Sequence, residues 1–418
     1  MPAFSPDLMS DVRARFAHVD SCPFQGPRIF FENAGGALTL NSVVETSAKF
    51  AAIPDNQGRD NPAAHALVDL ISRAKQDMAT FFNPNGGQFF VGESGTELTF
   101  RLIRTAVMGA APGGAVIGST VEHPASRSAA THWAKAANKA YISVPHDDPT
   151  GSVSAEAYAA HMTPEVRVAT ILHTSPVTGI ANDVAAISAA IRKTSPHAYI
   201  FVDGIQHASH GHIDIRSYDI DGYVVSPYKV FSRHGYGVAW VSDRMTALPR
   251  EQLINGPADN WEMGTRDTGA YATFSDVVAY LDWLGRQRSD GANPRTRVEA
   301  AGAAIHAHEQ ALTETMLHGT GNLPGLAELP GITILGGVDN PAREGLVCFA
   351  LKDLPAADIV AHLNAQGIRT HVRKADHYSG NILTPLGLDS AVRVSMCHYN
   401  SVEEVSVFLA AMKEIAAT

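Results

Sequence analysis

The chain has 418 residues, of which 45% are hydrophobic and 18% charged, a composition typical of a globular protein with two or three domains. Its formal net charge of −10 argues against a general nucleic-acid binder, which presents a basic face, and without an apolar run of about 18 residues we expect no membrane span. Three scattered cysteines and the lack of HExxH and CxxC patterns predict neither a disulfide framework nor a metal site, and a start without an apolar core indicates no signal peptide, so we expect a cytoplasmic protein.

Short apolar runs alternate with amphipathic stretches from about residue 41 to residue 284. The runs are rich in β-branched residues, as expected for strands buried on both faces, and they predict strands at residues 115–117, 168–172, 199–202, 222–225 and 238–241. The stretches between them predict helices at residues 97–108, 126–137 and 182–193. This alternation is typical of a mainly parallel α/β sheet.

The pattern changes after about residue 291, where we expect a smaller α+β domain. Ser401 and Glu404 form a capping box at the start of its last helix. We predict a large domain at residues 41–290 and a small domain at residues 291–418, with residues 1–40 joining the small domain. The predicted elements of the small domain are helices at 295–315, 356–366 and 401–416 and strands at 332–335 and 345–351.

Two neighbouring strand ends carry the strongest chemical signal. One apolar strand ends at Asp203, in Asp203-Gly-Ile-Gln206, and the next delivers Ser226-Pro-Tyr-Lys229. Because ligands of open α/β sheets sit beyond the carboxyl ends of the strands, the acid and the lysine are expected to face one crevice. Taken alone, Asp203 also fits a helix cap and Lys229 a surface lysine.

This pair suits pyridoxal phosphate (PLP), a cofactor that stores the electron pair of a substrate carbanion in its ring. The ring nitrogen must stay protonated, which a buried carboxylate such as Asp203 enforces. The aldehyde must be held as a Schiff base by a lysine whose amine can be neutral. We therefore predict PLP as the cofactor and Lys229 as its covalent partner.

The spacing around this pair resembles the class V aminotransferase family, in particular its cysteine-desulfurase-like branch. Asp203, Gln206 and His210 match the family's Asp-Gly-x-Gln and the following His, and Ser226 and Lys229 match its Ser and Schiff-base Lys. The resemblance implies PLP fold type I, which has a large domain with a mainly parallel, mixed seven-stranded sheet flanked by helices and a smaller α+β C-terminal domain. It also implies that Gln206 and Ser226 contact the cofactor.

Further segments carry the resemblance along the large domain. Gly95-Thr96 resembles the family's phosphate loop, where small residues and the start of the next helix suit an anion. His123 matches the residue that stacks on the cofactor ring and can move protons. Thr265 lies in a segment that, in the family, reaches the phosphate of the neighbouring subunit, which implies a homodimer with shared active sites.

The family resemblance also implies which residues contact the substrate. Asn33-Ala34 resembles the family's loop that approaches the substrate. Arg393 resembles the arginine that binds the α-carboxylate of the substrate, a role that suits the planar, bidentate guanidinium. Arg373 matches a second family arginine near the substrate, with altered spacing before it. The implied substrate is an amino acid, a small molecule whose side chain cannot be read from the sequence.

Three positions depart from the family pattern. Tyr378 stands where the desulfurases carry their nucleophilic cysteine, and desulfuration needs a thiolate to take the sulfur. Pro176 replaces an Asn that assists the phenolic oxygen of the cofactor, and proline has no donor to offer. Tyr228 replaces a His before the lysine and still offers a phosphate donor. Persulfide-forming desulfurase activity is therefore not expected.

Several reactions fit these residues, with Lys229 as the base and His123 as a second catalytic group. We favour a β-elimination (C–S type) lyase, because the resemblance is to C–S-cleaving enzymes and Tyr378 or His377 could assist a leaving group. Aminotransfer is the first alternative, and epimerisation, which needs a second acid, is another. A non-enzymatic PLP-fold sensor is the remaining interpretation, and the joint presence of the predicted catalytic and cofactor residues argues against it.

Overall fold

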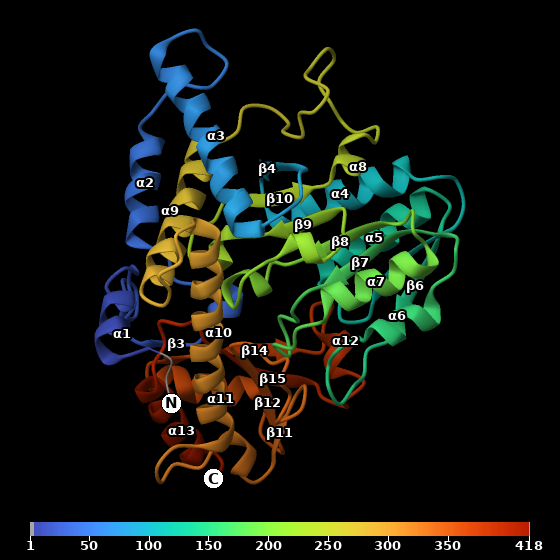
Figure 1. Cartoon of the computed structure of the whole chain (residues 1–418). Coiled ribbons are helices and arrows are strands. Elements are labelled where there is room, and N and C mark those ends of the chain that lie inside the picture. Colours follow the sequence, from blue (N-terminus) through green and yellow to red (C-terminus); the bar gives the residue numbers. More distant parts are fainter. Residues whose placement is uncertain (1–3, 418) are drawn as a thin grey trace.

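The computed structural model describes residues 4–417 and is built around two main β-sheets covered by helices (Figure 1). The larger sheet has seven strands in the order β4-β10-β9-β8-β7-β5-β6. β10 is antiparallel to both of its neighbours, and the remaining pairs are parallel. The strands are β4 (Gln88–Gly92), β5 (Ala115–Ser119), β6 (Ala140–Val144), β7 (Val166–Leu172), β8 (Tyr199–Asp203), β9 (Gly222–Val225) and β10 (Gly237–Val241).

Helices cover both faces of this sheet. On β8, Phe201 packs into an apolar cluster with α4 and α5, whereas Ile200 and Val202 belong to the cluster on the opposite face, with α3, α7 and α9. Burying both faces explains why these strands are continuous apolar runs. The helices of this part are α2 (Asn41–Ala51), α3 (Pro62–Phe82), α4 (Gly95–Gly109), α5 (Pro124–Ala136), α6 (Ala155–His161), α7 (Val184–Thr194), α8 (Asp243–Thr246) and α9 (Thr268–Arg286).

The five strands predicted in this region are all present, and the mainly parallel, mixed seven-stranded sheet is confirmed. β4 and β6 were not predicted. β6 lies at the edge of the sheet, where Ala140 and Ser143 are exposed, so its sequence lacks the continuous apolar run of a central strand.

The smaller sheet is antiparallel, in the order β11-β12-β15-β14. Its strands are β11 (Ile332–Ile334), β12 (Leu346–Leu351), β14 (His371–Lys374) and β15 (Ser390–Ser395), and its helices are α11 (Ala356–Ala365), α12 (Gly380–Leu383) and α13 (Val402–Ile415). The predicted capping box is present before α13, since Ser401 Oγ accepts from the Glu404 N–H at 3.3 Å and Glu404 Oε2 accepts from the Ser401 N–H at 3.1 Å. The long helix α10 (Pro294–His318) packs against both α9 and α13.

The N-terminal segment contains α1 (Pro6–Arg13), the small β1 (Ser21–Cys22) and β2 (Gly26–Pro27) pair, and β3 (Ile29–Phe30). β3 pairs in parallel with β13 (Ile368–Arg369), which places this segment against the small sheet (Figure 1). Five short 3₁₀ helices complete the described elements: Asn33–Gly35, His207–Ser209, Ile215–Ser217, Pro227–Lys229 and Leu326–Glu328. In residues 4–417, no helix combines the length and apolar character that a membrane crossing requires.

Candidate active site

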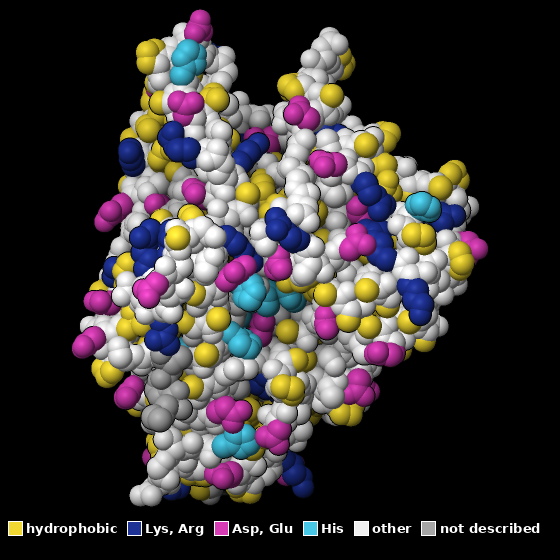
Figure 2. All heavy atoms as spheres, viewed as in Figure 1, with side chains coloured by type: hydrophobic (Ala, Val, Ile, Leu, Met, Phe, Trp, Pro, Cys, Tyr) yellow, Lys and Arg dark blue, Asp and Glu magenta, His cyan; other side chains and the backbone are white. Residues whose placement is uncertain are grey.

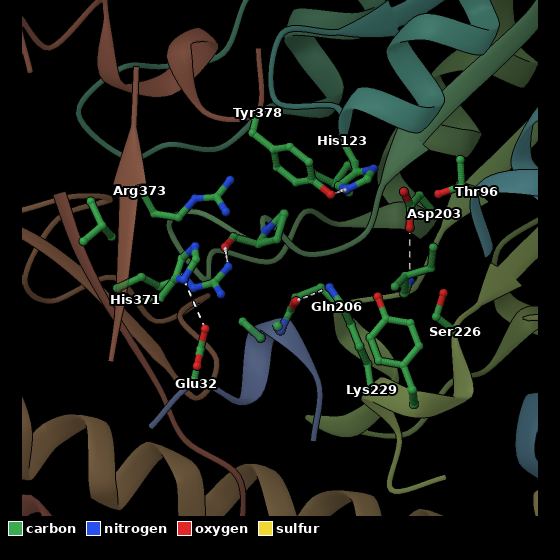
Figure 3. Close-up of a pocket in the computed structure, with 18 of the residues that line it drawn as sticks. Glu32, Thr96, His123, Asp203, Gln206, Ser226, Lys229, His371, Arg373 and Tyr378 are labelled. Carbon is green, nitrogen blue, oxygen red and sulfur yellow. Dashed lines mark hydrogen bonds and ion pairs between the residues drawn. The ribbon is translucent and has the colours of Figure 1, made fainter. Parts of the chain in front are cut away.

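A cavity of about 460 Å³ lies at the carboxyl ends of β8 and β9 (Figure 3). Side chains from the large sheet, the small sheet and the N-terminal segment line it. The predicted site residues among the lining are Ala34, Thr96, His123, Asp203, Gln206, Ser226, Tyr228, Lys229, Arg373 and Arg393. Segments far apart in the sequence therefore meet in one cavity, as the strand-end argument predicts.

Asp203 and Lys229 are both buried at this cavity. Asp203 Oδ1 accepts the N–H of Ile205 at 3.1 Å, and its Oδ2 accepts the hydroxyl of Ser126 at 3.3 Å. Burial raises the pKa of Asp203. Burial and the nearby positive charge of Arg393 lower the pKa of Lys229 to about 7, against the opposing effect of Asp203. Lys229 therefore has a substantial neutral fraction at neutral pH.

Gln206 connects Lys229 to the buried pair of His210 and Glu309 beside the cavity. Lys229 Nζ donates to Gln206 Oε1 at 3.3 Å, and Gln206 Nε2 lies 3.1 Å from Nε2 of His210. Nδ1 of His210 lies 2.7 Å from Glu309 Oε2. Burial opposes the charge on His210, but the Glu309 carboxylate outweighs it and raises the pKa of His210. This chain of contacts fixes the Gln206 amide beside the lysine.

The loop before α4 approaches the loop after β9 closely. Ser94 caps α4 by accepting the Glu97 N–H at 3.1 Å. A Cβ atom on Gly95 would overlap Ser226 Oγ and lie 2.6 Å from Cδ1 of Ile205, so only glycine allows this approach. The positive end of the α4 dipole, with Thr96 and Ser226 lining the cavity, therefore suits an anion.

His123 lies directly before α5 and faces Tyr378 across the cavity (Figure 3). Its Nδ1 accepts the N–H of Ala125 at 3.1 Å, and its Nε2 lies 3.0 Å from the Tyr378 hydroxyl oxygen. Burial and the positive charges of Lys229 and Arg373 lower the pKa of His123 to about 3. The neighbouring Glu122 is fully buried, and burial together with the charge of Asp203 raises its pKa to about 8. Both side chains are therefore uncharged at neutral pH.

Two buried arginines reach the cavity from the small sheet. Arg393, on β15, donates from Nη1 to the carbonyl of Pro176 at 3.0 Å, and Arg373, on β14, donates from Nε to Ser379 Oγ at 2.8 Å. Within residues 4–417, Arg393 Nε and Arg373 Nη2 have no hydrogen-bond partner, and neither guanidinium forms an ion pair with a carboxylate. Their charges are therefore available to an anionic ligand.

The structure differs from the sequence prediction at Asn33. Its amide donates to the carbonyl of Ser395 at 2.8 Å, and its Oδ1 accepts the Tyr399 hydroxyl. Asn33 is absent from the residues that line the cavity, because these internal contacts turn its side chain towards β15. The loop does approach the cavity, but through Ala34 and Gly35. Asn33 thus ties the N-terminal segment to the small sheet instead of facing a substrate.

Thr265 lies outside the lining of this cavity and is exposed, in the loop between α8 and α9. Gly95 also lies outside the lining, immediately before Thr96. The close approach of the loop before α4 to the loop after β9 explains why residue 95 is a glycine.

The sequence prediction did not include Glu32 and His371, which both line the cavity. Glu32 Oε1 lies 3.1 Å from Nδ1 of His371, and its Oε2 accepts from Arg369 Nε at 2.9 Å. Burial opposes the charge on Glu32, but these two partners outweigh it and lower its pKa. The only sequence signal was the position of Glu32 beside Asn33. The pairing of β3 with β13 brings these distant segments together.

The cavity fits PLP on the residues present. Asp203 can face the ring nitrogen, Lys229 is buried without an ion-pair partner in residues 4–417, and Thr96 and Ser226 line the cavity beside the start of α4, which suits a phosphate. Arg373 and Arg393 line the cavity without an ion-pair partner in residues 4–417, and their guanidinium groups suit the carboxylate of an amino acid. The described residues contain no group of three His, Cys, Asp or Glu side chains placed to hold a metal ion. This fold and cavity define a PLP-dependent enzyme of fold type I.

Comparison with known proteins agrees with this class. The family model of class V aminotransferases (Aminotransferase class-V) matches residues 29–290 and 296–408, and the chain belongs to this family. Its members are PLP-dependent enzymes. The chain is 26% identical over 414 residues to a probable cysteine desulfurase of Mycolicibacterium paratuberculosis, covering 93% of this chain and 56% of the relative, so it spans little more than half of that protein.

Two further similarities cover almost the whole chain. An aminotransferase-like protein of Gibberella zeae, FGM3, is 26% identical over 430 residues, which cover 97% of this chain and 98% of the relative. The apo structure of a cysteine desulfurase from Thermococcus onnurineus superimposes with a TM-score of 0.81 over 100% of both chains, at 19% sequence identity. The structural similarity establishes the shared fold.

Proposed function

We propose that this protein is a lyase that eliminates a β-substituent from an α-amino acid without forming a persulfide on the enzyme. The observation that carries the proposal is Tyr378, which lines the cavity and which, by the family resemblance, stands at the position of the nucleophilic cysteine of the desulfurases. None of the three cysteines lines this cavity, and Cys348 and Cys397 are buried elsewhere. Without a thiolate in reach, sulfur has no acceptor on the protein, so a cleaved group leaves as a free product.

Each wall of the cavity has a proposed role. Asp203 would hold the ring nitrogen of PLP, Lys229 its aldehyde carbon and Gln206 its phenolic oxygen. The phosphate would lie against the remaining cofactor residues, Gly95, Thr96, Ser226 and Tyr228, with His123 over the ring. Bound PLP supplies an electron sink for the pair released at Cα.

The substrate residues act around this sink. Arg393, which lines the cavity, would bind the α-carboxylate, and Arg373 would lie beside the substrate. The amine of Lys229, partly neutral at neutral pH, would take the proton from Cα. Loss of the β-substituent then gives an enamine, which water converts to pyruvate and ammonia.

A panel of β-substituted L-amino acids tests this function. Ammonia, pyruvate and the released sulfur species are measured together, with and without a keto acid. Elimination gives equal amounts of pyruvate and ammonia without a keto acid. Amino transfer that requires a keto acid and releases no ammonia would identify an aminotransferase instead. Loss of optical activity without either product would identify an epimerase.

We also propose that the protein is a homodimer in which Thr265 reaches the phosphate site of the partner. The loop between α8 and α9, which carries Thr265, projects from the body of the molecule (Figure 2). Leu253 and Ile254 in this loop are 62% and 93% exposed, which is typical of an interface. Sedimentation equilibrium should give twice the chain mass. A monomer with full activity would contradict the shared site.

A further inference from the structure

Contacts from within the turn and from α5 hold the turn that carries Tyr378, between β14 and α12. Asp376 Oδ1 accepts the N–H groups of Tyr378 at 2.8 Å and Ser379 at 3.3 Å. From α5, Arg127 Nη2 donates to the carbonyl of His377 at 2.8 Å. The Tyr378 side chain is 40% exposed, yet this turn fixes its ring at the edge of the cavity (Figure 3).

The hydrogen bonds of His123 determine which of its ring nitrogens carries the proton. Nδ1 accepts the N–H of Ala125, so this nitrogen must be unprotonated. The ring is neutral at neutral pH, because burial and neighbouring positive charges lower the pKa of His123 to about 3. Its single proton therefore lies on Nε2, which donates to the Tyr378 oxygen 3.0 Å away.

This arrangement leaves the proton of the Tyr378 phenol unused by the protein. Within the described chain, the hydroxyl has no hydrogen-bond partner other than His123. His123 Nε2–H points at the phenol oxygen, and the guanidinium carbon of Arg373 lies 5.0 Å from the ring centroid. The phenol proton is therefore free to be donated into the cavity.

We propose that Tyr378 is the acid that protonates the leaving group, with His123 as the positioning residue that keeps the phenol proton directed into the cavity. This inference rests on the β-elimination proposed above. Lys229 takes the proton from Cα, the Cβ–S bond breaks with its electron pair passing to sulfur, and the phenol proton moves to that sulfur. Solvent then returns a proton to the phenolate and removes the one on Lys229, so the protein is restored.

Two histidines are the competing acids. His377 is exposed and is absent from the cavity lining, and only its carbonyl is engaged by Arg127. His371 lines the cavity, but its Nδ1 faces Glu32 at 3.1 Å. The Tyr378 hydroxyl oxygen accepts the Nε2–H of His123, and the proton of the hydroxyl itself has no acceptor in the described chain. Tyr378 is therefore the group placed to act as the acid.

The test compares leaving groups of different acidity in the PLP-loaded enzyme. S-ethyl-L-cysteine releases a basic thiolate that needs protonation, whereas β-chloro-L-alanine releases chloride, which does not. Tyr378→Phe should lower kcat on S-ethyl-L-cysteine by about 10²- to 10⁴-fold, while the rate on β-chloro-L-alanine stays within about threefold. The matched control is Tyr199→Phe, which removes a hydroxyl from the opposite end of β8 and should leave both rates unchanged.

The outcomes separate this inference from the proposed function. If wild-type protein eliminates neither substituent, the lyase proposal fails. If it eliminates both and Tyr378→Phe slows both equally, the lyase stands and Tyr378 is not the acid. A loss confined to S-ethyl-L-cysteine in His371→Asn, with none in Tyr378→Phe, would assign the role to His371.

A second readout does not depend on turnover. In cofactor-free protein labelled with ¹⁵N-histidine, subtraction of the His123→Gln spectrum identifies the His123 ring signals. We expect a protonated Nε2 and an unprotonated Nδ1 between pH 6 and 8 in both wild-type and Tyr378→Phe protein, where the pKa of about 3 keeps the ring neutral. A protonated Nδ1 would make Nε2 an acceptor of the phenol proton and would overturn the inference.

Discussion

Two walls of the cavity differ in origin. The cofactor wall (Thr96, Asp203, Ser226 and Lys229) is built from a strand end, loops and a helix start of the large, mainly parallel sheet. The substrate wall (His371, Arg373, Tyr378 and Arg393) comes from the small antiparallel sheet and the turn before α12. The departure from the desulfurase pattern at Tyr378 lies on the substrate wall, where a changed side chain leaves Asp203 and Lys229 in place, whereas Pro176 and Tyr228 are departures on the cofactor side.

Removing the lysine of the cofactor wall should have the largest effect. Lys229→Ala deletes the buried amine beside Gln206, so we expect no covalently held cofactor and no turnover above background. Borohydride reduction and peptide mapping of wild-type protein should label Lys229. The exposed Lys352→Ala variant serves as control and should retain the label at Lys229. A label on another lysine would remove Lys229 from the cofactor wall.

The next effect belongs to the substrate wall. Arg393→Ala should lower kcat/KM about 10- to 150-fold, mainly through KM, because a hydrogen bond to a charged group contributes about 1.5–3 kcal/mol. Cofactor absorbance and thermal melting identify any general damage from the lost Pro176 contact. An unchanged KM in a variant with normal cofactor content would exclude the carboxylate role.

A smaller effect is expected where the two loops of the cofactor wall meet. Gly95→Ala places a Cβ against Ser226 Oγ, so these loops must separate. We expect PLP to bind at least about tenfold more weakly, in a protein that still folds, because the phosphate loses aligned donors. Gly113→Ala is a comparison in which a Cβ meets nothing within 4 Å, although its φ of 68° adds backbone strain. Equal PLP affinity in wild-type and Gly95→Ala would place the phosphate elsewhere.

The pH dependence of aldehyde capture tests whether the buried cofactor wall lowers the pKa of Lys229. Burial lowers its pKa to about 7, and only the neutral amine is nucleophilic. The rate at which cofactor-free protein captures an aldehyde should therefore rise about tenfold from pH 6 to pH 8 and then level off. Stopped-flow absorbance after mixing with PLP measures this rate. A rate still rising steeply above pH 9 would indicate a lysine with an ordinary pKa.

Modification of the cysteines should have no effect on turnover. Burial raises the pKa of Cys348 to about 12 and raises the pKa of Cys397 as well, so neither thiol is available as a thiolate. Treatment of the holoenzyme with iodoacetamide should leave turnover unchanged. Inactivation that follows modification of one cysteine would show that its thiol takes part in the reaction.

Much of the cofactor wall could be predicted from the sequence, because it depends on local spacing. The run from Asp203 to Lys229 spans two neighbouring strands and the connection between them, and burial on both faces makes these strands recognisable. The resemblance supplied His123 and Thr96, which line the cavity as expected.

The substrate wall was harder to predict because it depends on tertiary pairing. Glu32 and His371 meet only after β3 pairs with β13 and β14 pairs with β15. The direction of the Asn33 side chain could not be predicted for the same reason, since a side chain in a loop has no periodicity that fixes its direction. Its partners, Ser395 and Tyr399, lie more than 360 residues further along the chain.

Three hydrogen bonds join the part of the chain around the large sheet to the part around the small sheet beside the cavity. His123 meets Tyr378 at 3.0 Å, Arg127 meets the carbonyl of His377 at 2.8 Å, and Arg393 meets the carbonyl of Pro176 at 3.0 Å. Separation of the two parts would break all three contacts together. With Tyr378 as the proposed acid, protonation of the departing group would require these contacts to be intact.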